Sequence, residues 1–418
     1  MRLNRIVRRA SATVAFTSLA ATAGCNFFDV SNPGPIADEN LNAPTAMAGL
    51  VTGMAFDLSR AYDAVTQGAS IMSDDLYHAG SYGPGEGLWN RGIIRPEDIN
   101  GHWGGMHRAR WVAEQGIVRM KEVLGTGYDT SPLAARANIY AGLANRLLGE
   151  LTCNSVIDGG PSGDHKIHFQ RAEANFTEAI RIANSLTGAI KDSLLRVASG
   201  GRASVRAWQG NWATAVTDAQ VVPIAYVFVA PFSTNTAAEN NDLAFETTTR
   251  SEFTVFNTVW ATVRDPRVPW DTVRTTSGAL AVGQDGRTTF FRQRKYRDLA
   301  ADIPMVKGTE MLLLRAEAAL RNNDVPGAVT LINQVRAFHT ISTAPLPPLT
   351  GITTLAEAWP ALQRERGATL WLEARRLWDL RRWNAETGPA KNTFLDTRDK
   401  CIPISLNEVQ SNPNLRGS

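Results

Sequence analysis

The chain has 418 residues, of which 43 are Lys or Arg and 40 are Asp or Glu, so its formal charge is +3. Hydrophobic residues make up 44% of the chain and charged residues 20%, which is typical of globular proteins and excludes disordered and fibrous classes. A chain of this length is able to bury a large core. What the small basic excess means depends on where the charges lie.

The N-terminus carries an export signal. The first 24 residues hold four arginines and no acidic residue, and an apolar run of 14 residues occupies positions 10–23. A basic start, a short apolar run and a small-residue exit are the pattern of a secretory signal peptide, and the run is shorter than the ~20 residues of a membrane-spanning helix. Without residues 1–24, 39 basic residues face 40 acidic ones, so the mature charge is −1. This charge, and the lack of a basic run with interleaved aromatic residues, disfavours nucleic acid as a partner.

Cys25 ends the leader. Ala23-Gly24-Cys25 resembles a bacterial lipobox, in which the cysteine is lipidated, for example with palmitate, and becomes the mature N-terminus; Thr22 stands where the pattern usually has Leu. We expect a lipoprotein, because cysteine is rare in the chain (three in all) and this one stands at the expected exit. Its acyl chains would hold the protein on a membrane, since each buried CH₂ contributes about 0.8 kcal/mol. Residues 25–35 are then the lipidated N-terminus and a turn-rich tether. An ordinary signal peptide with an incidental cysteine is the alternative.

Besides Cys25, the chain has two cysteines, Cys153 and Cys401. An exported protein folds in a compartment that permits disulfides. The sequence leaves two alternatives open, a disulfide between them or two separately buried thiols, because it gives no distance between the residues.

Helical periodicity dominates the mature chain. Apolar residues recur at three- and four-residue steps, which is the spacing of one helix face. The pattern predicts helices within residues 44–62, 107–124, 132–147, 169–186 and 359–383.

Two later segments predict close helical hairpins. In each, Ala is followed after eight residues by Asn or Asp and after four more by Ala, which is a small residue on one helix, a polar turn and a small residue on the next. Such pairs resemble tetratricopeptide (TPR) units, although the full repeat motif is absent. The residues are Ala203, Asn211 and Ala215 in the first segment, and Ala316, Asp324 and Ala328 in the second.

Residues 222–302 differ in composition and sequence pattern from the rest of the chain. They contain β-prone stretches at 226–230 and 288–296 and are rich in Thr, Asn, Asp and Gly. We therefore predict a mainly α protein in which TPR-like hairpins form a single domain, residues 36–418, with a loop-rich insertion that has a few short strands. Binding surfaces are common on such insertions when a rigid scaffold carries them.

Signals for catalysis and for cofactors are weak. The sequence has neither a Gly-rich phosphate loop nor a G-x-S-x-G elbow. Cys153, His165 and His168 have irregular spacing and no fourth ligand, so we expect surface histidines and no metal or cofactor. Asp74 and Asp75 form an acidic pair, but adjacent residues usually point apart, whereas glycoside hydrolysis needs two carboxylates that face each other. We expect no enzyme.

Tryptophan is the unusual residue, with 11 copies. A flat indole stacks on the apolar face of a sugar ring and keeps a polar edge for hydrogen bonds. Trp89 lies beside the glycine-rich stretch at 80–87, and Trp260 and Trp270 lie in the insertion. Tryptophans on the helical repeats are expected to pack in the core: Trp111, Trp208, Trp212, Trp371, Trp378 and Trp383.

Short motifs in order along almost the whole mature chain resemble the SusD/RagB-like nutrient-binding lipoproteins of bacterial outer membranes. The most specific stretch is similar to the ER…E…R…DL-x-RW helix of that family, with Ala374 where the family has glycine, a departure that we expect a helix to accommodate. The motifs are Asn32-Pro33-Gly34, residues 45–53, residues 103–120, Asp265-Pro266-Arg267, Lys295-Tyr296, residues 311–318, residues 332–336, Glu365-Arg366, Leu370, Glu373, Arg375, residues 379–383, residues 401–404 and Asn412-Pro413-Asn414.

The resemblance implies four TPR-like helix pairs and a ligand site on the loop-rich lobe at 222–302. It also implies a SusC-like TonB-dependent barrel, which imports the captured glycan or oligopeptide at the cell surface. The family motifs give no ligand contacts, so composition and placement alone select the site residues. We expect an oligosaccharide site formed by Tyr82, Trp89, Trp260 and Trp270, with Asp74 and Asp75 as hydrogen-bond acceptors.

Other interpretations stay open. The same role with an oligopeptide ligand is one, and a TPR-like scaffold whose ligand is another protein is a second. A degradative enzyme comes third, because the sequence has no recognisable catalytic constellation.

Overall fold

The computed structural model describes residues 38–81, 84–341 and 344–415. Cys25, Tyr82 and the motif at Asn32-Pro33-Gly34 lie outside them. The chain divides at Ala46 into two units. The described part of the first unit consists of two 3₁₀ turns, η1 (Asp38–Asn42) and η2 (Pro44–Ala46).

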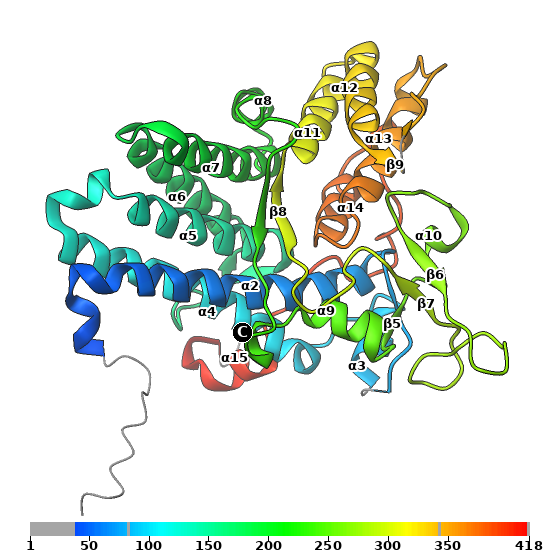
Figure 1. Ribbon diagram of the computed structural model, residues 1–418, viewed down its shortest axis with the longest axis horizontal. Helices are drawn as coiled ribbons and strands as arrows, with labels where there is room; N and C mark the ends of the chain where they lie inside the picture. The colour runs from blue at the N-terminus through cyan, green and yellow to red at the C-terminus, as the bar shows by residue number, and fades with distance from the viewer. Residues whose placement is uncertain (1–37, 82–83, 342–343, 416–418) are drawn as a thin grey trace, which may run out of the picture. The chain divides into compact units, whose positions relative to one another are not determined.

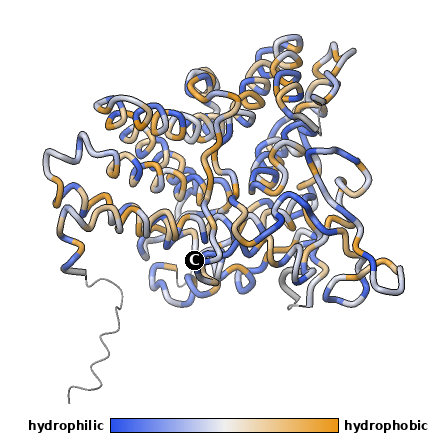
Figure 2. Tube along the Cα trace, in the orientation of Figure 1, coloured by the Kyte–Doolittle hydropathy of each residue, from blue (hydrophilic) through white to orange (hydrophobic). Residues whose placement is uncertain are grey.

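The second unit, residues 47–418, is built mainly of helices. In Figure 1, α2, α5, α6 and α7 lie one above another, and α11 to α14 form a neighbouring group. Figure 2 shows apolar and polar residues alternating along these helices, as expected for helices that bury one face. The longer helices are α2 (Met47–Met72), α4 (Asn100–Leu124), α5 (Pro132–Leu151), α6 (Lys166–Asn184), α7 (Gly188–Trp208), α8 (Trp212–Gln220), α11 (Gly308–Arg321), α12 (Val325–Phe338), α13 (Leu355–Thr369) and α14 (Arg376–Asn384).

Short helices and turns join them. None of the described helices combines the length and the apolarity that crossing a bilayer requires. The short helices are α3 (Pro84–Trp89), α9 (Asp242–Ala244), α10 (Val259–Thr262) and α15 (Leu406–Ser411), and the remaining 3₁₀ or π turns are η3 (Pro96–Ile99), η4 (Gly125–Thr130), η5 (Ala237–Glu239), η6 (Phe245–Thr249), η7 (Gly388–Ala390) and η8 (Pro413–Leu415).

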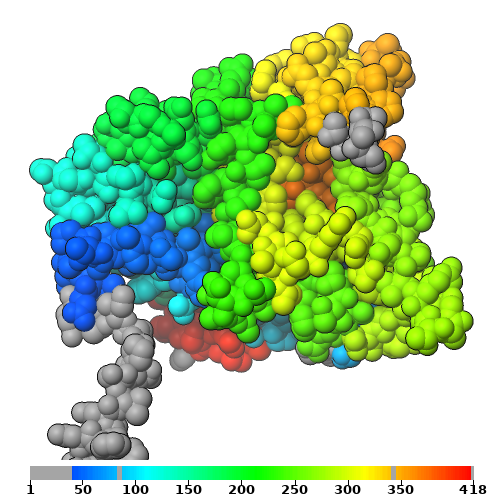
Figure 3. All heavy atoms as spheres, viewed as in Figure 1, coloured from blue at the N-terminus to red at the C-terminus, as the bar shows by residue number. Residues whose placement is uncertain are grey.

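The strands form two-stranded antiparallel pairs. The β4–β8 pair runs between the two helical groups, and the β6–β7 pair belongs to a protruding corner of the unit (Figures 1 and 3). The pairs are β1 (Tyr77–His78) with β5 (Phe253–Thr254), β2 (Asn154–Ser155) with β3 (Gly163–Asp164), β4 (Val227–Ala230) with β8 (Ile303–Lys307), β6 (Trp270–Thr272) with β7 (Phe291–Gln293), and β9 (Thr340–Ile341) with β10 (Ala344–Pro345).

The structure confirms the predicted helical hairpins. In the α11–α12 pair, Ala316 and Ala328 are fully buried where the helices meet, and the Asp324 side chain caps α12 by accepting a 2.8 Å hydrogen bond from the Gly327 amide. In the α7–α8 pair, Ala203 and Ala215 are equally buried. Small side chains let both helix axes approach closely. The mainly α fold with a strand-poor, loop-rich insertion is therefore confirmed.

The expectation of one continuous helix through residues 359–383 is wrong. The chain leaves the helix between α13 and α14, and Leu372 and Ala374 adopt φ angles of 55° and 54°. This left-handed conformation costs a residue with a Cβ atom about 1–2 kcal/mol, and glycine avoids that cost. Ala374 is therefore not a helix-compatible departure from the family glycine. It stands in a turn that favours glycine.

Cys153 and Cys401 form a disulfide, with Cα atoms 5.1 Å apart. Of the two alternatives left open by the sequence, the structure has the pair. The bridge joins the segment that follows α5 to the segment that precedes α15. Backbone pairing supports it on both sides, because Cys153 N–H donates to Ile402 O (2.9 Å) and Ile402 N–H donates to Leu151 O (2.8 Å).

Candidate functional site

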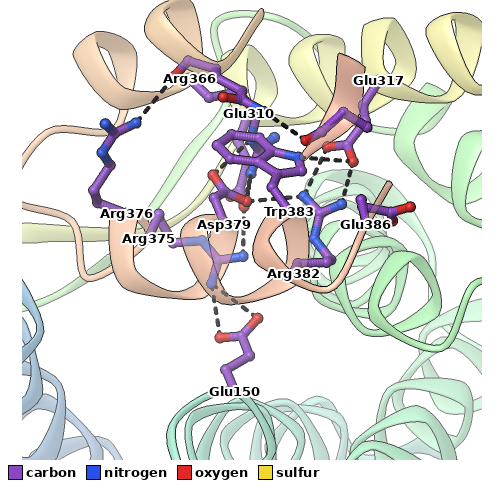
Figure 4. A network of polar contacts seen from close by, with 12 residues as sticks. Glu150, Glu310, Glu317, Arg366, Arg375, Arg376, Asp379, Arg382, Trp383 and Glu386 are labelled. Atoms are coloured by element: carbon purple, nitrogen blue, oxygen red, sulfur yellow. Dashed lines mark hydrogen bonds and ion pairs between the residues drawn. The ribbon is translucent and has the colours of Figure 1, made fainter. Parts of the chain in front are cut away.

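A buried ion-pair network holds the helices that carry the rest of the site (Figure 4). Glu317 on α11 accepts from Arg382 (2.8 Å) and from the indole of Trp383 (3.2 Å) on α14. Asp379 accepts from Arg366 on α13 at 2.7 and 2.9 Å. The most specific family-like stretch of the sequence thus connects α11, α13 and α14.

The electrostatics of this network fix the charge of Glu317. Burial alone would raise the pKa of its carboxyl, but the charge of Arg382 and its hydrogen bonds, helped by Arg366 and Arg321, lower that pKa to about 2. Glu317 is therefore ionised at every pH at which the protein is expected to work. Removing Glu317 would leave Arg382 with Asp379 as its remaining counter-ion, and removing Arg382 would leave Glu317 with Arg321.

A second part of the network reaches α5. Arg375 donates to Glu150 on α5 at 3.1 Å and lies 2.8 Å from Glu310 on α11. Both carboxylates are buried. The turn between α13 and α14 is therefore tied to the central helices from one side.

From the other side, the same turn holds the loop-rich lobe, residues 222–302. Lys295, which follows β7, lies 2.5 Å from Glu373, and Lys307 at the end of β8 lies 2.8 Å from the same carboxylate. Tyr296 donates from its hydroxyl to Leu372 O at 2.9 Å. Burial lowers the pKa of Lys295 to about 8, although Glu373 opposes this shift.

Four of the six predicted ligand residues belong to one connected structure. Asp74 accepts from Arg376 at 2.7 and 2.9 Å, and Asp75 accepts from the indole N–H of Trp260 at 2.8 Å. Trp270 donates its indole N–H to Trp260 O at 3.1 Å. These residues join the end of α2 to the lobe.

Burial decides what they do there. Asp75 and Trp260 are 1% and 2% exposed. Burial, reinforced by the neighbouring Asp74 charge, raises the pKa of Asp75 to about 7, although Arg376 partly offsets the shift. In this structure Asp75 and Trp260 anchor the lobe from inside and present no surface to a ligand.

Trp89 lies in the core as well. It is 1% exposed, its ring meets His102 edge-on at 5.3 Å between centroids, and its carbonyl accepts from Arg398 at 2.9 Å. The glycine-rich stretch beside it suggested exposure, but α3 turns the indole inward.

Among the predicted aromatic residues that the structure describes, Trp270 is the one that reaches the surface, and it is half-buried. One face of its ring stacks on Phe291, with centroids 4.6 Å apart and planes 9° apart. The exposed Arg264 lies over the ring with its guanidinium carbon 3.7 Å from the centroid. Phe256 meets Phe291 edge-on at 5.2 Å. We call Phe256, Trp270, Phe291 and Arg264 the Trp270 cluster.

The surroundings of the Trp270 cluster are basic. Residues 259–297 contain eight Lys or Arg residues against three Asp residues. On the opposite face of the β6–β7 hairpin, Asp271 accepts from Arg292 at 2.9 Å and lies 3.6 Å from Arg294. Aromatic faces beside guanidinium donors suit a ligand that is rich in oxygen atoms.

The residues weighed for zinc have other partners. Cys153 is in the disulfide, and His168 is hydrogen-bonded to Ser155 (3.0 Å) and to Asn145 (2.9 Å). His168 is fully buried, so the expectation of a surface histidine is wrong for it. Over the described ranges no group of three or more His, Cys, Asp or Glu side chains is arranged to hold a metal ion.

Trp111 is a residue that the sequence reasoning misplaced. It was expected in the core, but 50% of it is exposed, and it lines a pocket of about 460 Å³ beside α4. The signal was in the helix spacing, because Arg108, Trp111, Gln115 and Val118 follow one another at three- and four-residue steps on the exposed face of α4.

Comparisons with known proteins agree with this fold. Residues 291–401 match the model of the SusD family. Among curated proteins none matches the chain significantly in sequence.

Solved structures are similar over most of the chain. A SusD/RagB family protein from Bacteroides thetaiotaomicron has a TM-score of 0.66 at 12% identity, covering 88% of this chain and 94% of its own. A SusD superfamily protein from Bacteroides fragilis has a TM-score of 0.64 at 16% identity, covering 90% and 99%. A laminarin-binding SusD-like protein has a TM-score of 0.60 at 15% identity, covering 89% and 99%. The chain therefore has the SusD/RagB fold and carries a SusD-family segment at residues 291–401, which confirms the resemblance found in its sequence.

Proposed function

We propose that this protein is a cell-surface lipoprotein without catalytic activity, which captures oligosaccharides and passes them to a SusC-like TonB-dependent transporter of the outer membrane. Lipidation at Cys25 would anchor it. The fold supports the proposal, and so do similar structures described as a laminarin-binding SusD-like protein and a SusD-like carbohydrate-binding protein from Bacteroides vulgatus.

The observation that carries the proposal is the Trp270 cluster. Its rings lie on a lobe that Lys295, Tyr296 and Trp260 fix to the helical scaffold. The backbone that carries Trp270 is therefore already in place, which lowers the entropy cost of binding, and a ligand that stacks on the indole has to displace only the exposed Arg264. The arginines around it are hydrogen-bond donors for hydroxyl groups.

The disulfide supports export of the protein, and the hydrogen bonds of the acidic pair support a binding role over hydrolysis. The Cys153–Cys401 disulfide suits a protein that folds outside the cytoplasm. Asp74 and Asp75, the acidic pair considered for hydrolysis, are engaged by Arg376 and Trp260. A glycosidase needs two carboxylates that face each other across a substrate bond.

Calorimetry with laminarin, starch and cellulose oligosaccharides tests the proposal. Trp270→Ala should weaken binding by about fivefold, because aromatic contacts contribute about 0.5–1.5 kcal/mol beyond burial. Leu280→Ala is the matched control, since Leu280 is 43% exposed on the same lobe and lies outside the Trp270 cluster. Equal affinity of both variants for the oligosaccharide would show that the ligand binds at other residues. Binding of peptides in place of sugars would favour the oligopeptide role.

The partner and the anchor need separate tests. Affinity purification from membranes should recover a TonB-dependent barrel with the lipoprotein, and Cys25→Ser should release the protein from the membrane fraction. Recovery of a barrel-free periplasmic complex would favour a TPR-like interaction scaffold.

A further inference from the structure

A second concave site lies on the helical scaffold, away from the lobe. We call it the Trp111 pocket. Its volume is about 460 Å³, within the usual range of ligand pockets, and none of its lining residues belongs to residues 222–302. It is lined mainly by His107, Arg110 and Trp111 on α4, by Val156 and Asp158 in the segment after β2, and by Glu408 on α15.

The indole of Trp111 is not covered by another ring or cation of the described residues, whereas the indole of Trp270 is covered. Half of Trp111 is exposed, and among the described residues no aromatic ring or cation lies over it. Trp270 has Phe291 on one face and Arg264 on the other. A sugar ring can therefore stack on Trp111 without displacing another side chain.

The polar groups of the pocket balance in charge. Arg110 donates to Asp158 at 2.6 Å, and this hydrogen bond is the main cause that lowers the pKa of Asp158. Glu408 accepts from the Trp103 indole at 3.4 Å, and Arg108 is the second cation of the lining. Burial lowers the pKa of His107 to about 4, so this ring is neutral at pH 7. Two cations and two anions suit an uncharged ligand with hydroxyl groups.

The walls of the pocket are held in place by contacts distant in sequence. The disulfide joins Cys153, three residues before Val156, to Cys401, seven residues before Glu408. Asn412 donates to Gly160 O at 2.9 Å, and Asn414 donates to Gly159 O at 2.7 Å. The segment that carries Asp158 is thus fixed to the C-terminal segment on both sides, which makes the pocket preorganised.

We infer that the Trp111 pocket is a second saccharide-binding site, which stacks one uncharged sugar ring on Trp111 and binds its hydroxyls through Asp158 and Glu408. The choice of a saccharide rests on the proposed function. The site itself is separate from the Trp270 cluster, and the disulfide keeps its two walls together.

Fluorine NMR of the full mature chain labelled with 5-fluorotryptophan tests this inference, and the natural glycan need not be identified first. Trp111→Phe and Trp270→Phe assign the two resonances, and maltose, cellobiose and laminaribiose are added up to high millimolar concentration. We expect the Trp111 resonance to shift with at least one disaccharide.

Each pattern of shifts has a distinct meaning. A shift at Trp111, with or without one at Trp270, supports the second site. A shift at Trp270 alone overturns the second site and leaves the proposed function standing. With no shift at either residue for any of the sugars, both are overturned.

Variants separate the pocket from the helix surface. Trp111→Ala should weaken binding of the shifting sugar by about fivefold. Val118→Ala is the matched control, because Val118 lies on α4, is also 50% exposed and does not line the pocket. Equal losses in both variants would show that the loss is not specific to Trp111, and would overturn the saccharide site.

The disulfide gives a second readout. The Cys153→Ser, Cys401→Ser double variant should reduce the shift at Trp111 at equal sugar concentration and leave any shift at Trp270 unchanged. An unchanged Trp111 titration in a folded double variant would overturn the role of the disulfide in the pocket.

Discussion

The guanidinium carbon of Arg264 lies 3.7 Å from the centre of the Trp270 ring, so a cation covers the one face of this indole that Phe291 leaves open. Arg264 is exposed, and it makes no ion pair with a described acidic residue. A ligand that stacks on Trp270 must therefore displace Arg264 first.

Arg264→Ala should consequently tighten the binding of an uncharged oligosaccharide by about two- to fivefold, because an exposed cation–π contact is worth about 0.5–1 kcal/mol. Calorimetry measures the change. Arg274→Ala, in the same lobe, is the control for loss of charge alone. Weaker binding in the Arg264 variant would show that Arg264 contacts the ligand directly.

Glu317→Gln should lower the free energy of unfolding by about 3–5 kcal/mol, since it breaks the buried ion pair with Arg382 and leaves that guanidinium with Asp379 as its remaining counter-ion. Urea unfolding followed by circular dichroism measures the loss. Glu386→Gln removes a partner of Arg321 whose side chain is 31% exposed, and it should cost less than about 1 kcal/mol. Similar losses in both variants would contradict the central place of Glu317 in the network.

Ala374→Gly should raise the free energy of unfolding by up to about 1 kcal/mol. The left-handed φ of 54° is strained for alanine, and the greater freedom of glycine in the unfolded chain cancels part of the gain. Leu372→Gly relieves the same strain but removes a fully buried side chain, so it should destabilise the protein by about 2–5 kcal/mol. A destabilised Ala374→Gly variant would argue against the left-handed turn.

Asp75 should make stability depend on pH between about 4 and 7. Its folded pKa of about 7 lies above the ordinary value of 3.8, so the folded state binds more protons in this range and loses stability as pH rises. Asp75→Asn abolishes this contribution, which amounts to up to about 4 kcal/mol by pH 7. Unfolding of both proteins at pH 4 and pH 7 tests this, because parallel changes would place the pKa of Asp75 near its ordinary value.

Much of the helical fold could be predicted because local rules determine it. A closely packed hairpin is predicted by the small residues Ala316 and Ala328 and by the capping aspartate between them. The turn at Leu372 and Ala374 could not be predicted, because neither residue type signals a left-handed backbone. Tertiary contacts of Glu373 and Tyr296 hold that turn in place.

The site was predictable only in part. Trp260 and Trp270 were selected for their aromatic character, but burial depends on which elements cover a residue, and sequence alone does not supply that. For Trp89 and Trp111 the exposure expected from the sequence was wrong in opposite directions. A loop-rich context suggested exposure for Trp89, which is buried, and a helical context suggested burial for Trp111, which is exposed.

Lys295, Tyr296 and Trp260 hold the lobe together with the β1–β5 pair and the buried Arg267–Glu365 ion pair, so an exchange of the lobe has to keep these anchors. A chimaera could take residues between those anchors from a relative and keep Glu373, Leu372 and Asp75 as the receiving surface. Such an exchange would replace most of the Trp270 cluster and leave the helical scaffold unchanged.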